Sequence, residues 1–321
     1  MRYVYIDGYD LTSDVDSIPA IDINIPEFSV VDNKIMNDTN TLTLPQDYTS
    51  FFKNGRDINK ITVQIYEDSK LVFDGFVDTI EYRLRSVVVT TKSKTTILFN
   101  STLDADYVIV DAYPSNILKQ LCGLLDITFN TFSYNTTLNY HKALDITFDV
   151  IDVDLNYAEL FQKLAEVTCG KIYFLNNEIY YEIFSNGLEY PVVELNGKDF
   201  VSYPVIEQKS TIGTVYNGTD VKYGAGLILY NLTNATKVID MSNSSIIRTS
   251  NIITAQHIAQ SYDSLGSTKK YRLNAVVKES LKNILYDFHR IYFDNRVYSI
   301  VNLNHESNND ISILAESVEE I

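Results

Sequence analysis

The 321-residue sequence contains no tryptophan, only two cysteines and only four histidines. Cys122 and Cys169 each fall in a segment with helical spacing, so we interpret both as small buried apolar side chains, with a disulfide between them as the alternative. The histidines do not stand at the short spacings at which imidazoles share a metal ion. We therefore expect no metal and no cofactor.

Basic residues are also scarce, because 26 Lys and Arg stand against 42 Asp and Glu, a formal charge of -16. Proteins that bind nucleic acid neutralise phosphates with Lys and Arg, so this balance argues against specific nucleic-acid binding. Solubility explains the charge most simply. The alternative is the wall of a conduit that repels DNA and lets it slide past.

Long apolar runs are missing, and none approaches the roughly 20 residues that span a membrane as a helix. The opening MRYVYIDGYD has no basic region leading into an apolar stretch. We expect neither a membrane span nor a secretory leader.

Glycine and proline number only 12 and 6, whereas tyrosine reaches 24, and a chain rich in Tyr, Ile, Val and Thr favours strands. The clearest alternation of apolar and polar residues runs through 60–66, 71–82 and 86–92, with short turns between them. This pattern predicts a three-stranded meander. Gly75 interrupts its middle strand and predicts a bulge or tight bend.

The middle of the chain changes character. Residues 114–125 and 154–167 carry apolar residues at helical spacing, and Asn156 with Glu159 fits a capping box at the second helix. A strand pair follows within 171–184. These segments predict a small α+β unit between all-β flanks.

Two segments more than two hundred residues apart follow one pattern, QIYEDSKLVFDGFVDTIEY and RIYFDNRVYSIVNLNH. In each, Ile-Tyr precedes a short acidic turn and a basic residue, Lys70 or Arg296. Val and an aromatic residue follow, and a third strand ends the segment. Because the matches include polar turn residues, the pattern indicates duplicated modules rather than two unrelated hairpins.

The order of these features resembles the baseplate and tail-tip hub proteins of tailed phages. Those proteins are similar to the late control proteins of contractile phages and to the N-terminal half of type VI secretion spike proteins. The resemblance rests on LVFDGFVDTIEY, on ILKQLC with YAELFQKLAEVTCGKIYFLNNEIYY, and on IYFDNRVYSIVNLNH. It covers nearly the whole chain, although no motif in it is specific alone.

The resemblance implies a mainly β fold with an α+β insertion, built from two barrels like the tail-tube subunit. It implies a first barrel at 1–103, interrupted by an α+β domain at 104–189 and completed by 190–212, and a second barrel at 213–321. It also implies a homotrimeric ring in the virion tail, assembled in the bacterial host cytoplasm, that joins a sixfold tube to a threefold spike or fibre. The implied partners are a tail tube or distal tail protein and a central spike, fibre or tape measure protein.

Enzyme motifs are missing: the sequence has no phosphate-binding glycine loop, no G-x-S-x-G and no H-E-x-x-H. Two acidic pairs have a spacing compatible with glycosidase chemistry, but 42 acids produce such pairs by chance. We assign no catalytic residue and expect no enzyme. The four histidines are expected to be solvated. The acidic pairs are Asp104 with Asp106 and Asp152 with Asp154, and the histidines are His141, His257, His289 and His305.

Tyrosines supply the runner-up function, a carbohydrate- or receptor-binding tail module. Tyr180, Tyr181 and Tyr292 lie in predicted strands, where exposed rings can stack on sugars. The simpler interpretation is that these rings pack against neighbouring strands.

Overall fold

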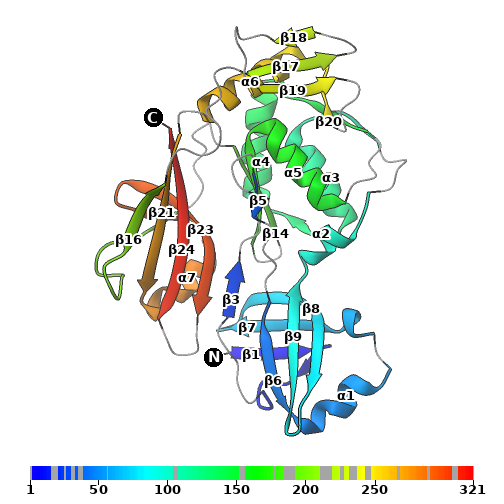
Figure 1. Cartoon of the computed structure of the whole chain (residues 1–321), viewed down its shortest axis with the longest axis vertical. Helices are drawn as coiled ribbons and strands as arrows, with labels where there is room; N and C mark the ends of the chain where they lie inside the picture. Colours follow the sequence, from blue (N-terminus) through cyan, green and yellow to red (C-terminus); the bar gives the residue numbers. More distant parts are fainter. Residues whose placement is uncertain are drawn as a thin grey trace.

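In the computed structural model, two curled β-sheets lie beside a mixed α/β region (Figure 1). The first sheet is at the bottom of Figure 1, the second at the left, and the α/β region lies above the first sheet and to the right of the second. The structure describes residues 2–15, 21–24, 27–29, 33–34, 39–55, 57–103, 108–151, 156–175, 178–183, 192–209, 219–224, 228–230, 237–242, 247–265, 268–287, 290–305 and 310–320.

The first sheet has the strand order β2-β1-β7-β8-β9-β6, with every neighbouring pair antiparallel. Alternate apolar residues of its strands are buried because successive side chains of a strand point to opposite faces. Its strands are β1 (Arg2–Ile6), β2 (Tyr9–Asp10), β6 (Thr41–Pro45), β7 (Thr62–Glu67), β8 (Lys70–Tyr82) and β9 (Ser86–Ser93). The connection from β6 to β7 contains η1 (Gln46–Tyr48), α1 (Thr49–Lys53) and η2 (Ile58–Lys60).

Gly75 lies where two strands approach closely. A Cβ atom there would collide with the main-chain oxygen of Lys92, so no larger residue fits without movement of β9. The predicted distortion of this meander is present on either side of Gly75. The register shifts between Ile65 and Tyr66 on β7, and between Val77 and Thr79 on β8.

The second sheet has the order β15-β22-β23-β24-β21-β16, and β3 pairs with β23. Its apolar core merges with that of the first sheet into a single buried cluster. Its strands are β3 (Ile21–Asn24), β15 (Val193–Glu194), β16 (Val205–Lys209), β21 (Thr268–Val277), β22 (Arg290–Phe293), β23 (Arg296–His305) and β24 (Ile311–Glu320). The connection from β21 to β22 contains η3 (Glu279–Leu281) and α7 (Lys282–Asp287).

The predicted repeat is confirmed by the topology. In each sheet a strand leads through a 3-10 turn and a short helix into a three-stranded meander, and that first strand pairs with the last strand of the meander. The order β7-β8-β9-β6 thus corresponds to β22-β23-β24-β21. The flanks differ, because β1 runs antiparallel to β7 whereas β15 runs parallel to β22.

The hairpins that open the two meanders also correspond. Both central residues of each turn have positive φ, 47° and 71° at Asp68 and Ser69, and 50° and 59° at Asp294 and Asn295. This is the signature of the type I′ turn that suits a two-residue hairpin, and Asp and Asn tolerate it better than most residues.

The predicted domain limits need correction. We expected 190–212 to complete the first barrel, but within it β15 and β16 pair with β22 and β21 of the second sheet. We also expected 213–321 to form the second barrel as one piece. Instead, residues of β17, β19 and α6 belong to the core of the α/β region. Alternation along a strand identifies its buried face but not its partner, which explains both errors.

The α/β region therefore combines segments from distant parts of the chain. Its sheets have the orders β10-β12-β20, β11-β14-β13-β4-β5 and β18-β17-β19. The strands are β4 (Glu27–Ser29), β5 (Asn33–Lys34), β10 (Ile109–Ala112), β11 (Thr128–Phe129), β12 (Phe148–Val150), β13 (Gly170–Leu175), β14 (Glu178–Ile183), β17 (Thr219–Gly224), β18 (Ile228–Tyr230), β19 (Lys237–Ser242) and β20 (Ile247–Arg248). The helices are α2 (Thr96–Asn100), α3 (Pro114–Leu124), α4 (Thr131–Ala143), α5 (Tyr157–Thr168) and α6 (Ile252–Leu265).

Candidate functional site

The junction between the two sheets is the most elaborate polar feature of the described chain. The β7–β8 hairpin of the first sheet reaches α7, which precedes the meander of the second. Nζ of Lys70 donates a hydrogen bond of 2.7 Å to the main-chain oxygen of Asn283. Nζ of Lys282 lies 2.9 Å from Oδ2 of Asp68. The hairpin is therefore tied to the helix by opposite charges at its turn.

Next to these contacts between the β7–β8 turn and α7, Glu67 forms the centre of a buried cluster with Arg2, Tyr286 and His305. Oε2 of Glu67 accepts hydrogen bonds from Nε of Arg2 at 3.4 Å and from the hydroxyl of Tyr286 at 3.0 Å. It lies 3.2 Å from Nδ1 of His305. Arg2 also donates to the main-chain oxygen of His305 at 2.7 Å. At most 7% of each of these residues is exposed, so the cluster is shielded from water.

The charges of this cluster compensate one another. Burial alone would raise the pKa of Glu67, but the hydrogen bond from His305 and the charge of Arg2 outweigh it and lower the pKa to about 2. Burial and the neighbouring Glu67 carboxylate both raise the pKa of the Tyr286 phenol, which keeps it a hydrogen-bond donor. Lys282, 3.6 Å from Oε1 of Glu67, adds a second cation. Glu67 is thus ionised at neutral pH.

This cluster fixes how the two sheets sit against each other. Arg2 and Glu67 belong to the first sheet, whereas Tyr286 lies in α7 and His305 in β23 of the second module, 219 and 238 residues further along the chain than Glu67. Directional bonds to a buried carboxylate permit few arrangements of the groups around it. The expectation that His305 is solvated was wrong, since its exposed fraction is 0%.

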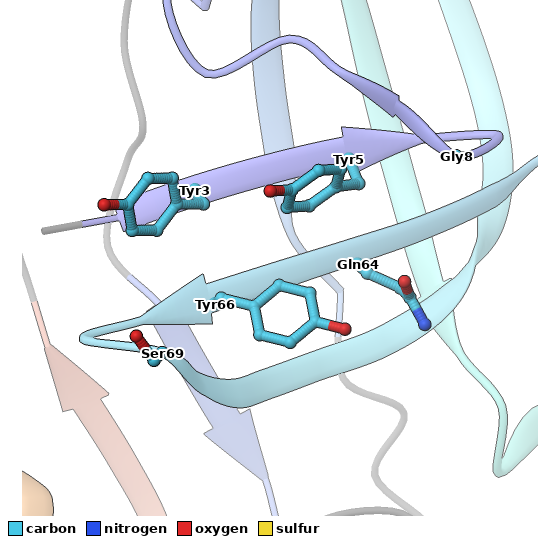
Figure 2. Close-up of a pocket in the computed structure, with 6 residues that line it drawn as sticks. All are labelled: Tyr3, Tyr5, Gly8, Gln64, Tyr66 and Ser69. Atoms are coloured by element: carbon cyan, nitrogen blue, oxygen red, sulfur yellow. The ribbon is translucent and has the colours of Figure 1, made fainter.

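A second feature is an aromatic groove on the outer face of the first sheet. Figure 2 shows Tyr3 and Tyr5 side by side on β1, with Gln64 and Tyr66 on β7 below them. The register places Tyr3 opposite Tyr66, and the rings of Tyr5 and Tyr66 meet edge to face at 5.6 Å. Gly8 and Ser69 complete the lining of a pocket of about 520 Å³. The groove presents three aromatic rings together with hydroxyl and amide groups.

Comparison with known proteins identifies the architecture. No family model matches the sequence, and no curated protein matches it. Several solved structures match over almost the whole chain, and two of them have TM-scores above 0.5. The 43 kDa tail protein of prophage MuSo2 from Shewanella oneidensis gives a TM-score of 0.53 at 12% identity, over 99% of this chain and 98% of that one. The tail protein from Neisseria meningitidis MC58 gives 0.55 at 10% identity, over 99% and 96%. This chain has a tail-protein fold. The predicted resemblance is thereby confirmed for the fold.

Two further predicted positions lie inside this tail-protein fold rather than on its surface. His141 on α4 is 1% exposed and His257 on α6 is half-buried, so the expectation that both are solvated was wrong. Burial, together with the neighbouring His257, lowers the pKa of His141 to about 3, and burial lowers the pKa of His257 to about 4. Both imidazoles are neutral at physiological pH. Cys122 and Cys169 are buried thiols, as predicted.

The tyrosines predicted as a possible sugar platform are mostly internal. Tyr181 has an exposed fraction of 0%, and the ring of Tyr180 stacks on Tyr173 with centroids 5.1 Å apart. Tyr292 is half-buried on β22. The simpler interpretation, packing between strands, therefore holds for Tyr180 and Tyr181. The sequence analysis missed the aromatic groove, although Tyr3, Tyr5 and Tyr66 alternate with apolar residues along their strands.

Other predicted positions fall outside the described residues, namely Asp104, Asp106, Asp152, Asp154 and His289. Within the part of the chain that the structure describes, no three His, Cys, Asp or Glu side chains come together as metal ligands would. No helix of that part is both long and apolar enough to cross a membrane.

Proposed function

We propose that this chain is the structural hub of a phage-type tail, at the baseplate or tail tip of the virion. Three copies would form a ring that joins the sixfold tail tube to a threefold spike or fibre. The observation that carries the proposal is the duplication: one chain holds two copies of the strand–helix–meander module within a tail-protein fold. A homotrimer would therefore present six similar modules, which matches a sixfold tube on one side and threefold partners on the other.

The junction supports a structural role over a catalytic one. Its buried ionic cluster and the shared apolar core hold the two modules in one orientation, as a ring subunit requires. The proposed neighbours are a tail tube or distal tail protein and a central spike, fibre or tape measure protein. Assembly would take place in the cytoplasm of the bacterial host.

The proposed ring encloses part of the channel through which DNA leaves the particle. DNA carries one negative charge per about 1.7 Å of its axis, so a wall of Lys and Arg would retain it. The net charge of -16 suits an acidic or neutral wall. A ring lined by basic side chains would contradict this part of the proposal.

We propose no enzymatic activity for the chain. Zymography on bacterial cell walls tests this directly and is expected to give no clearing. Clearing by the native chain that disappears in an Asp152→Asn, Asp154→Asn double variant would assign a hydrolase to the acidic pair instead.

The aromatic groove favours a second candidate, a carbohydrate-binding tail module. Tyr3, Tyr5 and Tyr66 offer ring faces and hydroxyl groups in one groove, the combination that binds sugar rings. A glycan array tests it with Tyr3→Ala and Tyr66→Ala variants, and Tyr203→Ala, an exposed tyrosine elsewhere in the chain, is the matched control. Binding that only the groove variants lose would support this candidate.

The hub proposal is tested by the mass of the assembly in solution. Sedimentation of the chain, alone and after mixing with its tail-tube protein, is expected to give a three-copy species. If the isolated chain sediments as a monomer, the sample mixed with the tail-tube protein decides the test. Dimers or tetramers in both samples would refute the hub.

A further inference from the structure

Each module carries two complementary surfaces, a hairpin and a helix. Within the chain, the β7–β8 hairpin of the first module contacts α7 of the second. The β22–β23 hairpin of the second module and the η1–α1 segment of the first are the counterparts of these two surfaces. Each chain therefore carries a second hairpin and a second helix of the kinds that meet at the junction.

The turns of the two hairpins correspond in position, although β7–β8 has a register shift beyond its turn and β22–β23 has none. Glu67 pairs with Lys70 across one turn, and Phe293 pairs with Arg296 across the other. Both turns begin with an Asp of positive φ and end before a basic residue. Arg296 thus holds the position of Lys70, the residue that binds α7.

The helices are equivalent as well. In both modules a three-residue 3-10 turn runs directly into the α-helix. The fourth helical residue is buried in each, with exposed fractions of 3% at Phe52 and 2% at Leu285. In this register Ser50 corresponds to Asn283, whose main-chain oxygen accepts the hydrogen bond from Lys70.

The contact is head-to-tail, so it can be repeated from one copy to the next. Figure 1 shows α7 at the end of the second sheet that faces the first, and α1 on the side of the first sheet that faces away from the second. Contacts between two different surfaces form closed rings when the rotation allows it, and open filaments when it does not.

Resting on the proposed hub function, we infer that the β22–β23 hairpin of one copy docks on the η1–α1 segment of the next copy. Arg296 takes the place of Lys70 and reaches the main-chain oxygen of Ser50. Asp294 takes the place of Asp68 and faces the hydroxyl of Thr49, which corresponds to Lys282. A second copy of this chain is thus the partner of both surfaces.

The receiving surface has the chemistry to accept an arginine. Tyr9 is 56% exposed, its ring meets Phe51 edge to face at 5.7 Å, and Phe51 also meets Tyr48 at 6.4 Å. Aromatic rings bind guanidinium groups on their faces, and Arg296 already lies 4.1 Å from the ring of Tyr271 in its own chain. Within one chain Asp294 pairs with Arg296 at 3.0 Å and Lys53 lies 4.5 Å from the Tyr82 ring, so docking would place the Lys53 charge near Asp294 in exchange for these contacts.

Site-directed cross-linking tests the inference. The Arg296→Cys, Ser50→Cys variant, treated with a short bis-maleimide, is expected to give a closed three-chain species. Each single variant should give no three-chain product. The wild-type chain reports any background from its two buried cysteines. Lys70→Cys with Asn283→Cys is the matched internal pair, and it should cross-link within one chain and leave a single-chain species.

The outcomes separate this contact from the hub itself. A trimer by sedimentation with no cross-link in the double variant would refute the contact and leave the hub standing. A ladder of two, three, four and more linked chains would support the contact but refute the closed trimer. If neither a trimer nor a cross-link forms, with or without the tail tube, both are refuted. Arg296→Cys with Lys142→Cys on exposed α4 checks that linking needs the proposed geometry.

Discussion

Replacing Glu67 by glutamine keeps the size of the side chain but removes the negative charge at the centre of the junction. Arg2, 3.4 Å from the carboxylate, would then face a neutral amide in a site closed to water, whereas Lys282 keeps its ion pair with Asp68 at 2.9 Å. A buried charge that loses its partner costs several kcal/mol. The variant is therefore expected to be clearly less stable at neutral pH.

The lowered pKa gives the magnitude independently. Glu67 titrates at about 2 instead of its ordinary 4.5, and each tenfold change in the acid constant corresponds to about 1.4 kcal/mol, so the carboxylate contributes about 3 kcal/mol. Because the pKa is lower in the folded chain, this contribution is present above pH 4.5 and is lost as the pH falls towards 2. The difference between wild type and Glu67→Gln should shrink over the same interval.

Guanidinium denaturation followed by far-UV circular dichroism measures this difference at pH 7 and at several lower values. Glu81→Gln is the matched control, because Glu81 forms its ion pair with Arg83 at the surface, with 63% of its side chain exposed. We expect no measurable shift of its midpoint. Equal midpoints for Glu67→Gln and Glu81→Gln at pH 7 would refute the buried ionic junction.

Three further outcomes follow from the described packing. Gly75→Ala should lower the free energy of unfolding by about 1–3 kcal/mol, because the added Cβ atom has no space. Gly123→Ala, where α3 leaves open space for a Cβ atom, should raise the free energy of unfolding by about 0.5–1 kcal/mol. Thermal denaturation of both variants measures these changes. His141 and His257 should remain neutral down to pH 5 in NMR titrations, and a midpoint near 6.5 for either would contradict their burial. Cys122, whose pKa burial raises to about 12, should react with a thiol reagent only after unfolding, and rapid reaction of the native chain would show that α3 opens.

Local signals predicted local structure well. The capping box at Asn156 and Glu159 is present at the start of α5, and the turn at Asp68 corresponds to the one at Asp294, as the repeat indicated. These features depend on residues a few positions apart, so the sequence contains their whole cause. By contrast, the sequence did not predict α4, because its Thr, Asn and Tyr residues give weak helical periodicity, although the Asn130 side chain caps its first turn by accepting from the main-chain N–H of Ser133.

Long-range structure could not be predicted from patterns of this kind. Alternation along β7 places Glu67 on the buried face with Val63 and Ile65, but it does not specify that His305, 238 residues away, meets it there. The assignment of β16 to the second sheet rests on pairing with β21, which alternation along a strand does not specify. The aromatic groove likewise depends on the register that places Tyr3 beside Tyr66.

The symmetry of the assembled particle tests the hub most directly. Electron microscopy of the chain bound to its tail tube should show, in end-on averages, a ring of six similar modules around an open channel, with strict threefold symmetry. The ring should carry three α/β regions, one for each pair of modules, which lowers its symmetry from sixfold to threefold. A ring with another number of modules, or particles in which copies meet through the α/β regions and leave no channel, would contradict the account.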